Sequence, residues 1–328
     1  MKKPNTLLPI VALYVLPIFL LLTAFAGCDN EEPIIPVEKS NNTGVSGSQQ
    51  KGEYVLVKEW GESLLEDPVG ITIDRSGNIY VADNAQVKKF TADGVFIETF
   101  GKGFFANNKL DIPERGIATD GDKYIYIADY NFYTDAGWGR IVKLTLNGSL
   151  VKEWKTYSPM GIAVDSSGNI LVTCYEGQGI LKFNAEGELL LSVGSTVIGF
   201  QIPYDFLDPH DIAVDGSGNF YVVDWSNCIR EFSPDGKFLK LWENPDRWNT
   251  VRSIILDDSD NIYVTDYSSA KKLTIDGKIL SEWDVCVPPS GVSWDRNALP
   301  DIAVDNNGNV YVVDAINKCV KEFAVLKQ

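Results

Sequence analysis

The segment Asp208-Pro-His-Asp-Ile-Ala-Val-Asp-Gly-Ser-Gly-Asn-Phe-Tyr-Val-Val-Asp224 recurs along the chain with variations, and this repetition indicates the fold. Six copies align, at residues 67–83, 112–129, 158–174, 208–224, 250–266 and 299–314. The Asp that closes the first apolar run of each copy falls at Asp74, Asp120, Asp165, Asp215, Asp257 and Asp305. The steps between these aspartates are 46, 45, 50, 42 and 48 residues. A period in this range, with strand-like units, indicates a repeat architecture in which each unit packs on the next.

Each copy contains the elements of a small antiparallel sheet. In the first copy, two β-branched or aromatic runs, residues 71–73 and 79–82, flank a turn that contains Gly77-Asn78. Gly accepts a positive φ and Asn bonds the nearby backbone, so this segment favours a tight turn. Two further strands follow, separated by a second turn at Asp93-Gly94. Four short strands per repeat predict an all-β fold, a six-bladed β-propeller.

The sixth copy lacks its fourth strand, and a matching strand stands before the first copy. After Asp314 the chain offers only the apolar run 319–323. The segment 54–61 precedes the first copy and resembles Leu150-Val-Lys-Glu-Trp154. We therefore expect segment 54–61 to be the outer strand of the sixth blade. Such a closed ring leaves no open edge between its first and last blades.

The copies resemble NHL repeats. The consensus of that family reads roughly Pro-x-Gly-Ile-Ala-Val-Asp, two further residues, and Gly-Asn-Ile-Tyr-Val-Ala-Asp. Pro159-Met-Gly-Ile-Ala-Val-Asp165 and Gly77-Asn-Ile-Tyr-Val-Ala-Asp83 are similar to its two halves, and the resemblance covers essentially everything after residue 52. Tyr263-Val-Thr-Asp266 and Tyr311-Val-Val-Asp314 also look like neighbouring propeller families. The resemblance implies the fold and leaves the activity open, because propellers carry many functions.

The first residues have the pattern of an export signal. Met1-Lys-Lys3 is followed by an apolar stretch over residues 7–26 and then by Gly27-Cys28. Phe25-Ala-Gly-Cys28 resembles a bacterial lipobox, which implies a lipoprotein signal peptide over residues 1–27 and lipidation of Cys28. The alternative is an uncleaved membrane anchor, since the apolar stretch is long enough to span a bilayer. Either arrangement predicts a membrane-anchored protein of the cell envelope, with the propeller outside the cytoplasm.

Composition separates a linker from the propeller and argues against one class of partner. Residues 28–52, after the signal, are rich in Ser, Asn, Gln, Pro and Gly and predict a flexible tether. The propeller then spans residues 53–328. The full chain has a net charge of −16, and removal of residues 1–27 also removes two lysines. Because nucleic-acid binding relies on clustered Lys and Arg, this acidity predicts no nucleic-acid partner.

Four cysteines follow Cys28 in the chain: Cys174, Cys228, Cys286 and Cys319. An exported protein meets an oxidising environment, where disulfides are plausible. Four cysteines allow three connectivities, and proximity in the predicted blades favours Cys174 with Cys228 and Cys286 with Cys319. Four buried free thiols are the alternative. No C-x₂-C spacing supports a metal site formed by these cysteines.

The predicted strand directions sort the loops onto two faces. The Gly-Asn and Asp-Gly turns are short and share one face, called the turn face here. The connections before the first strand and after the second strand of each blade share the opposite, long-loop face, and they differ from blade to blade, which favours ligand binding there. They carry Tyr130, Trp138 and Trp225, which suit sugar, peptide or protein contacts. The alternative for any of these aromatic side chains is packing between blades.

The residues just before each innermost strand should line the mouth of the central channel. Three copies keep Gly there and three have polar residues. We therefore expect one group of side chains near the axis: Arg115, His210, Asp211, Arg252 and Asp301. Arginines grip carboxylates and phosphates through paired hydrogen bonds, so the group could bind an anionic ligand, or act as a catalytic cluster. A structural ion-pair network is the alternative.

The sequence favours a non-catalytic binding scaffold whose protein, peptide or carbohydrate ligand docks on the long-loop face. The alternative is a metal-dependent hydrolase or lyase of the lactonase-like propeller type. His210 is the single histidine of the chain, which excludes the multi-histidine zinc site of the amidating lyases. A lactonase-like calcium site would draw on carboxylates such as Asp211 and Asp301, but Arg115 and Arg252 beside them would oppose a cation. No catalytic residue and no cofactor is therefore predicted.

Replacement of Cys28 tests the predicted anchor. Cys28→Ala removes the thiol that would carry the lipid, so the protein should leave the membrane fraction or keep its signal segment. Incorporation of a fatty-acid analogue should be lost in this variant. Wild-type protein that retains residues 1–27 and shows no lipid by mass spectrometry would contradict the lipobox interpretation.

Overall fold

The computed structural model describes residues 54–101, 116–130, 138–175, 177, 179–194, 206, 208–242, 251–285 and 300–325. All the described residues lie within residues 42–328, one of the two units into which the chain divides. Every regular element in the described ranges is a β-strand. The same ranges contain no helix with the length and apolar character needed to cross a membrane.

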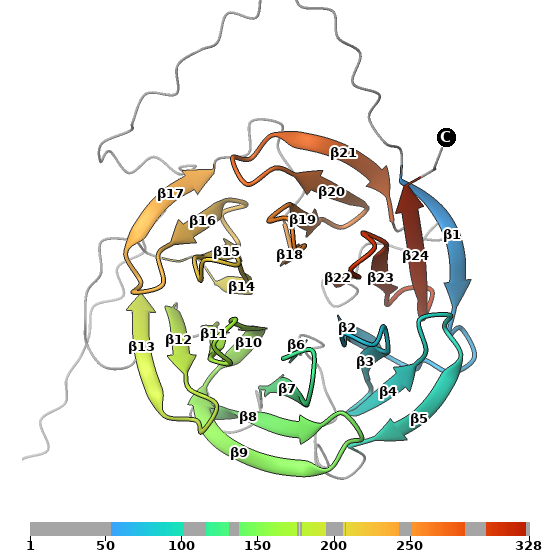
Figure 1. Cartoon of the computed structure of the whole chain (residues 1–328), viewed down its shortest axis with the longest axis horizontal. Coiled ribbons are helices and arrows are strands. Elements are labelled where there is room, and N and C mark those ends of the chain that lie inside the picture. Colours follow the sequence, from blue (N-terminus) through green and yellow to red (C-terminus); the bar gives the residue numbers. More distant parts are fainter. Residues whose placement is uncertain are drawn as a thin grey trace, which may run out of the picture. The chain divides into compact units, whose positions relative to one another are not determined.

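The strands form six four-stranded antiparallel sheets arranged as blades around a centre (Figure 1). Blade 1 consists of β2 (Pro68–Ile73), β3 (Ile79–Asp83), β4 (Gln86–Phe90) and β5 (Phe96–Phe100). Blade 2 consists of β6 (Ile117–Thr119), β7 (Tyr124–Asp129), β8 (Trp138–Thr145) and β9 (Leu150–Tyr157). Blade 3 consists of β10 (Pro159–Val164), β11 (Ile170–Cys174), β12 (Gly179–Phe183) and β13 (Leu189–Gly194). Blade 4 consists of β14 (Pro209–Val214), β15 (Phe220–Asp224), β16 (Ile229–Phe232) and β17 (Phe238–Trp242). Blade 5 consists of β18 (Ser253–Leu256), β19 (Ile262–Thr265), β20 (Ser269–Leu273) and β21 (Ile279–Asp284). Blade 6 consists of β22 (Ile302–Val304), β23 (Val310–Asp314), β24 (Cys319–Val325) and β1 (Tyr54–Trp60). The predicted six-bladed propeller is confirmed.

The sixth blade is assembled from both ends of the repeat region. Strand β1 pairs antiparallel with β24, from Tyr54 opposite Val325 to Trp60 opposite Val320. The expected closing strand is therefore confirmed. Tyr54 also stacks on Trp283 of blade 5, with ring centroids 4.2 Å apart, and its hydroxyl lies 3.2 Å from that of Tyr263. The closing strand thus contacts the preceding blade as well as its own.

The recurring Asp after each innermost strand caps the following turn. Asp74 Oδ1 accepts hydrogen bonds from the backbone N–H groups of Ser76 and Asn78, and its Oδ2 accepts from the Asn78 amide and the Tyr80 hydroxyl. The same bonds from the residues two and four positions later recur at Asp165, Asp215, Asp257 and Asp305. These bonds satisfy turn donors that strands leave unpaired. The repeated carboxylates of this position are structural.

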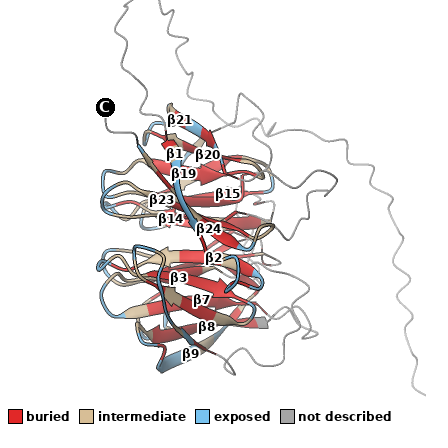
Figure 2. Cartoon of the chain, turned by 90° about the vertical axis from the view of Figure 1, so that its right-hand side faces the viewer, coloured by how far each residue is buried: buried red, intermediate tan, exposed pale blue. Residues whose placement is uncertain are grey.

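The hydrophobic core lies between the blades. Six clusters of buried side chains each join two adjacent blades, one cluster for each seam of the ring. The seam between blades 6 and 1, for example, contains Val313 and Val320 from one side and Ile79 and Val81 from the other. In Figure 2 the inner strands are mostly buried, while exposed residues gather in turns and outer strands. Each blade therefore covers its faces only through its neighbours.

A second contact repeats at the outer edge of the seams. A side chain from the outer strand of one blade covers the glycine of the second turn in the next blade, as Trp60 does at Gly94. Gly94 has a φ of 71°, and a Cβ there would lie 2.6 Å from the Trp60 ring. Only glycine meets both conditions without strain. The equivalent contacts pair Phe100 with Gly148, Trp154 with Gly187, Val193 with Gly236 and Trp242 with Gly277.

Ion pairs with a buried carboxylate join the second and third strands of most blades. Asp83 pairs with Lys88, Asp129 with Arg140, Asp224 with Arg230, Asp266 with Lys271 and Asp314 with Lys321. In blade 3 the register places Cys174 where the carboxylate stands elsewhere, and Leu181 where four blades have the cation. Both charges are replaced together there. This agrees with the high cost of leaving one buried charge without its partner.

Loss of Tyr54 should open the seam between blades 5 and 6. Tyr54→Ala removes a buried aromatic ring from its stack on Trp283, so we expect the free energy of unfolding to fall by about 3–5 kcal/mol. Val57→Ala on the same strand is the control, because Val57 is 52% exposed, and it should change stability by no more than about 0.5 kcal/mol. Deletion of residues 53–61 should lower stability further. A deletion variant that melts like the parent would show that β1 does not close the ring.

The ion pair of blade 5 provides a double-mutant cycle. Lys271→Leu should destabilise the protein by about 3–5 kcal/mol, because Asp266 keeps a buried charge without its cation. Asp266→Cys combined with Lys271→Leu copies the natural pair of blade 3 and should recover part of this loss in chemical unfolding. A double variant that loses as much as the two single variants together would show that the residues are not coupled.

Candidate functional site

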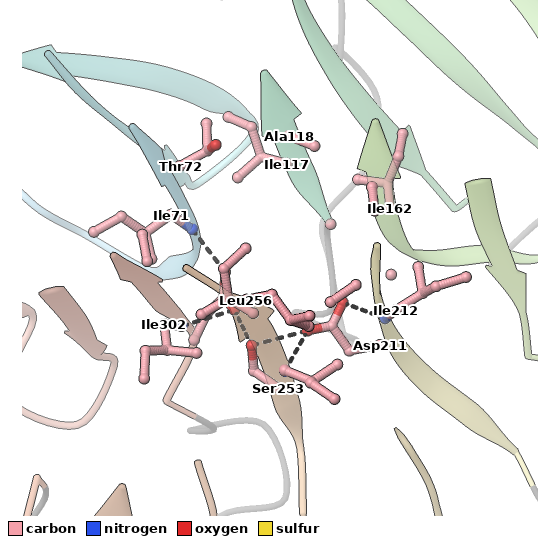
Figure 3. Close-up of a pocket in the computed structure, with 18 of the residues that line it drawn as sticks. Ile71, Thr72, Ile117, Ala118, Ile162, Asp211, Ile212, Ser253, Leu256 and Ile302 are labelled. Atoms are coloured by element: carbon pink, nitrogen blue, oxygen red, sulfur yellow. Dashed lines mark hydrogen bonds between the residues drawn. The ribbon is translucent and has the colours of Figure 1, made fainter. Parts of the chain in front are cut away.

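The innermost strands β2, β6, β10, β14, β18 and β22 enclose a cavity of about 370 Å³. This volume lies in the range of small-molecule sites. Most of the wall comes from aliphatic residues and backbone of these strands, including Ile71, Ile117 and Ile302 (Figure 3). The polar side chains His210, Asp211, Arg252, Ser253 and Asp301 stand where β14, β18 and β22 begin. The cavity is therefore polar mainly on the side of blades 4, 5 and 6.

Ser253 bridges two carboxyl groups at the start of these strands. Its Oγ lies 2.8 Å from Oδ2 of Asp211 and 2.5 Å from Oδ1 of Asp301. Figure 3 shows the hydrogen bond that joins Ser253 to Asp211. Burial, together with the carboxylate of Asp301, raises the pKa of Asp211 to about 8, and burial also raises the pKa of Asp301. Both effects disfavour a second negative charge at this place, where the two Asp residues are half-buried.

The two carboxyl groups also bind backbone N–H groups of the next blades. Asp211 accepts from Ile254 in blade 5, and Asp301 accepts from Ile71 in blade 1, at 2.9 and 2.7 Å. Innermost strands have a free edge whose donors face the channel, so these carboxyls satisfy them. With the Ser253 bridge, the network crosses the seams between blades 4 and 5, 5 and 6, and 6 and 1. The structural interpretation of Asp211 and Asp301 thus has direct support.

Arg252 lies at the centre of a second polar group. Its guanidinium carbon lies 4.4 Å from the ring centroid of Trp225 and 5.6 Å from that of Tyr267. Nη1 donates to Nε2 of His210 at 2.8 Å, and Nη2 donates to the Tyr267 hydroxyl at 3.1 Å. Arg252 is 5% exposed, His210 is 7% exposed, and Trp225 is 36% exposed. Aromatic faces and hydrogen bonds therefore fix the orientation of one guanidinium beside the cavity.

The structure brings together some of the predicted site residues. His210, Asp211, Arg252 and Asp301 all line the cavity, and Trp225 packs on the Arg252 guanidinium. Tyr130 is buried, at 6% exposure, and is not among the residues that line the cavity. Trp138 begins β8, opposite Tyr157 of β9. Arg115 and the lipidation residue Cys28 lie outside the described residues.

The predicted disulfides are wrong. Cys174 and Cys319 are free, buried thiols, so neither the pair of Cys174 with Cys228 nor that of Cys286 with Cys319 forms. Successive side chains of β11 point to opposite faces of the sheet, and this explains why Cys174 does not pair with Cys228. Cys174 points into the cluster shared with blade 2, while its neighbour Thr173 faces blade 4 and donates to the His210 carbonyl. Burial raises the pKa of the Cys174 thiol to about 12. Cys228 and Cys319 donate to the Ser226 carbonyl and the Glu59 carboxylate, and Cys286 lies outside the described residues.

Two residues of the site were not singled out by the sequence. Ser253 occupies the same repeat position as Asp211 and Asp301, directly before or at the start of an innermost strand. This shared repeat position was the sequence signal that could have identified Ser253 as a site residue. Tyr267 follows the second strand of blade 5, as Trp225 follows that of blade 4. The two equivalent aromatic positions converge on Arg252 because adjacent blades repeat the same geometry.

No protein-family model matches the chain. Among curated proteins, 90 residues are 36% identical to peptidyl-glycine alpha-amidating monooxygenase B of Xenopus laevis, which is 26% of this chain and 10% of that protein. NHL repeat-containing protein 3 of Mus musculus is 29% identical over 133 residues, which is 36% of this chain and 38% of that protein. The chain therefore matches about a tenth of the amidating enzyme and less than half of the mouse protein.

The solved structures similar to this one share its fold. A streptogramin B lyase superposes with a TM-score of 0.56 and 16% identity over 85% of this chain and all of the other. A gluconolactonase from Xanthomonas campestris gives 0.57 and 13% over 80% of this chain and 87% of the other. The chain is a six-bladed β-propeller, with lyase and lactonase folds among its structural neighbours. Its repeats resemble NHL repeats, and the partial match to the mouse NHL repeat-containing protein agrees with this resemblance.

Proposed function

We propose that this protein is an extracytoplasmic, membrane-anchored binding scaffold that takes an anionic, carboxylate-bearing ligand at the mouth of the central cavity. The observation that carries the proposal is the fixed guanidinium of Arg252. It stands beside a cavity of about 370 Å³, between two aromatic rings and a histidine. A planar guanidinium held in one orientation is suited to recognise a carboxylate.

The arrangement of the cluster supports recognition by a pre-formed site. Trp225 and Tyr267 restrict the Arg252 side chain, so little conformational entropy is left to lose when a ligand binds. Trp225 stays more than a third exposed and presents an aromatic surface next to the charge. An aromatic surface beside a cation suits a peptide C-terminus, an acidic side chain or an acidic sugar. The remaining cavity wall gives such a ligand apolar contact.

The position in the fold supports the same proposal. The cluster stands at the beginning of innermost strands, where the connections that differ between blades arrive. The opposite ends of these strands lead into near-identical capped turns, whose carboxylates are already bound to the backbone. A repeated scaffold with one varied face usually binds its ligand on that face.

A metal-dependent hydrolase or lyase is the second candidate, and the likeness to a lyase and a gluconolactonase suggests it at the level of fold. Within the described residues, no group of three or more His, Cys, Asp and Glu side chains is arranged to hold a metal ion. Asp211 and Asp301 are engaged with Ser253 and with backbone donors. Metal analysis of the purified full chain separates the two candidates, because stoichiometric zinc, calcium or magnesium would favour the enzyme.

Replacement of Arg252 tests the binding proposal. A panel of carboxylates, phosphates, acidic sugars and neutral sugars would be screened by thermal shift, and hits measured by calorimetry. Arg252→Ala should weaken a carboxylate hit by on the order of thirtyfold, equivalent to about 2 kcal/mol for a buried anchor. Arg252→Lys should also bind more weakly, since a lysine cannot form the paired hydrogen bonds.

Lys237→Ala is the matched control, because Lys237 is an exposed cation on the turn face. It should leave the affinity unchanged. If Lys237→Ala weakens binding and Arg252→Ala does not, the ligand site lies on the turn face. If only neutral sugars bind, and Arg252→Ala has no effect on them, the ligand class proposed here is wrong.

A further inference from the structure

The contacts of Ser253 require more protons than its hydroxyl can supply. Two carboxyl oxygens lie 2.5 and 2.8 Å from the same Oγ, and both distances are those of hydrogen bonds. A serine hydroxyl has one proton to donate and can accept a second hydrogen bond through its lone pairs. If both carboxyls were ionised, one of the two contacts would bring oxygens together without a proton between them.

We propose that Asp211, Ser253 and Asp301 hold one exchangeable proton at neutral pH, and that this proton allows two carboxyl groups to join four blades at the axis. The Asp211 carboxyl then donates to Ser253 Oγ, and Ser253 donates to the Asp301 carboxylate. The shorter contact, 2.5 Å to Asp301, is typical of a hydroxyl that donates to a charged oxygen. The proposal is independent of the ligand proposed above.

The surroundings favour the neutral form of one carboxyl. Ser253 is 5% exposed, and burial is the main reason why the pKa of Asp211 rises to about 8. Backbone N–H donors on Asp211, from Ile212 and Ile254, act in the opposite direction because they favour the charged form. The other charged or titratable side chains that line the same cavity are His210, Arg252 and Asp258. Any titration must therefore be assigned to individual residues.

The proton has a mechanical role, because the network crosses three of the six seams. Asp211 reaches blade 5, Ser253 reaches blade 6, and Asp301 reaches blade 1 across the seam that closes the ring. Loss of the proton would place two negative charges against one hydroxyl, and their repulsion would act directly on these seams. At lower pH the same groups form a continuous hydrogen-bonded chain.

The sign of the effect on stability follows from linkage. The folded pKa of Asp211, about 8, exceeds the ordinary value of 3.8, so the folded state binds more protons than the unfolded state between these pH values. The contribution to stability is fully present below pH 3.8 and is lost as the pH rises through about 8. Most carboxylates in ion pairs behave in the opposite way.

The test is a carboxyl-resolved titration by ¹³C NMR of the full chain labelled at Asp, with thermal unfolding at each pH. In wild-type protein one Asp should titrate near pH 8, and the melting temperature should fall as the pH rises from about 5 to 8. In Asp301→Asn, Asp211 becomes the sole acceptor of the Ser253 proton and loses the neighbouring charge, so its titration should move to lower pH and the fall in melting temperature should become smaller. Asp211→Asn should have the same effect through Asp301.

Asp258→Asn is the control, because Asp258 lines the same cavity but is exposed. It should leave the alkaline titration in place. The proposal is overturned if all carboxyls of the wild-type protein ionise below pH 5, or if the alkaline titration stays at the wild-type pH in both Asn variants. If the wild-type titration near pH 8 moves below pH 5 only when calcium is added, the proposal is still supported, because the metal-free protein then holds the proton as proposed. If neither Asn variant folds, the wild-type titration alone decides.

Discussion

The structure depends on coverage of both faces of every blade. Each hydrophobic cluster belongs to a seam, so a blade without its neighbour would expose half of its core. A ring meets this condition only if it closes, and β1 closes it by pairing with β24 and stacking Tyr54 on Trp283. Two further sets of contacts hold adjacent blades together. Contacts such as Trp60 over Gly94 lie at the outer edge of the ring, and the carboxyl network lies at its axis.

Closure explains why charge is acceptable at the axis. Innermost strands present unpaired N–H groups to the channel, and side chains of the preceding blade can bind them. Blades 4 and 6 use Asp211 and Asp301 for this purpose, and Ser253 of blade 5 joins these two carboxyl groups. Blade 2 instead bonds to blade 3 through the Gly116 N–H and the Met160 carbonyl. The polar half of the cavity therefore serves the ring, and Arg252, held on Trp225, stands beside it as the group suited to a ligand.

The repeat pattern predicted most of the fold and part of the site. Strand count, blade number, turn positions and the closing strand follow from the six aligned copies, because each copy repeats the same local hydrogen bonding. The same alignment placed His210, Asp211, Arg252 and Asp301 around the axis, and the cavity confirms it. Ser253 and Tyr267 were not predicted as site residues, because the role of each depends on its contacts with other side chains around the axis and not on its own repeat. The disulfides were predicted wrongly because proximity of the predicted blades does not specify which face of the sheet Cys174 occupies.

The architecture can be read from the amino-acid sequence, since period, turn chemistry and apolar alternation are local properties that are present in every repeat. The three-dimensional structure is needed to show which carboxyls share a hydroxyl, which cations are buried with a partner, and which aromatic rings flank Arg252. It also showed that blade 3 replaces both members of the buried ion pair by Cys174 and Leu181. These features depend on distances between residues of different strands and blades. Such distances are fixed when the ring closes, and no single repeat contains them.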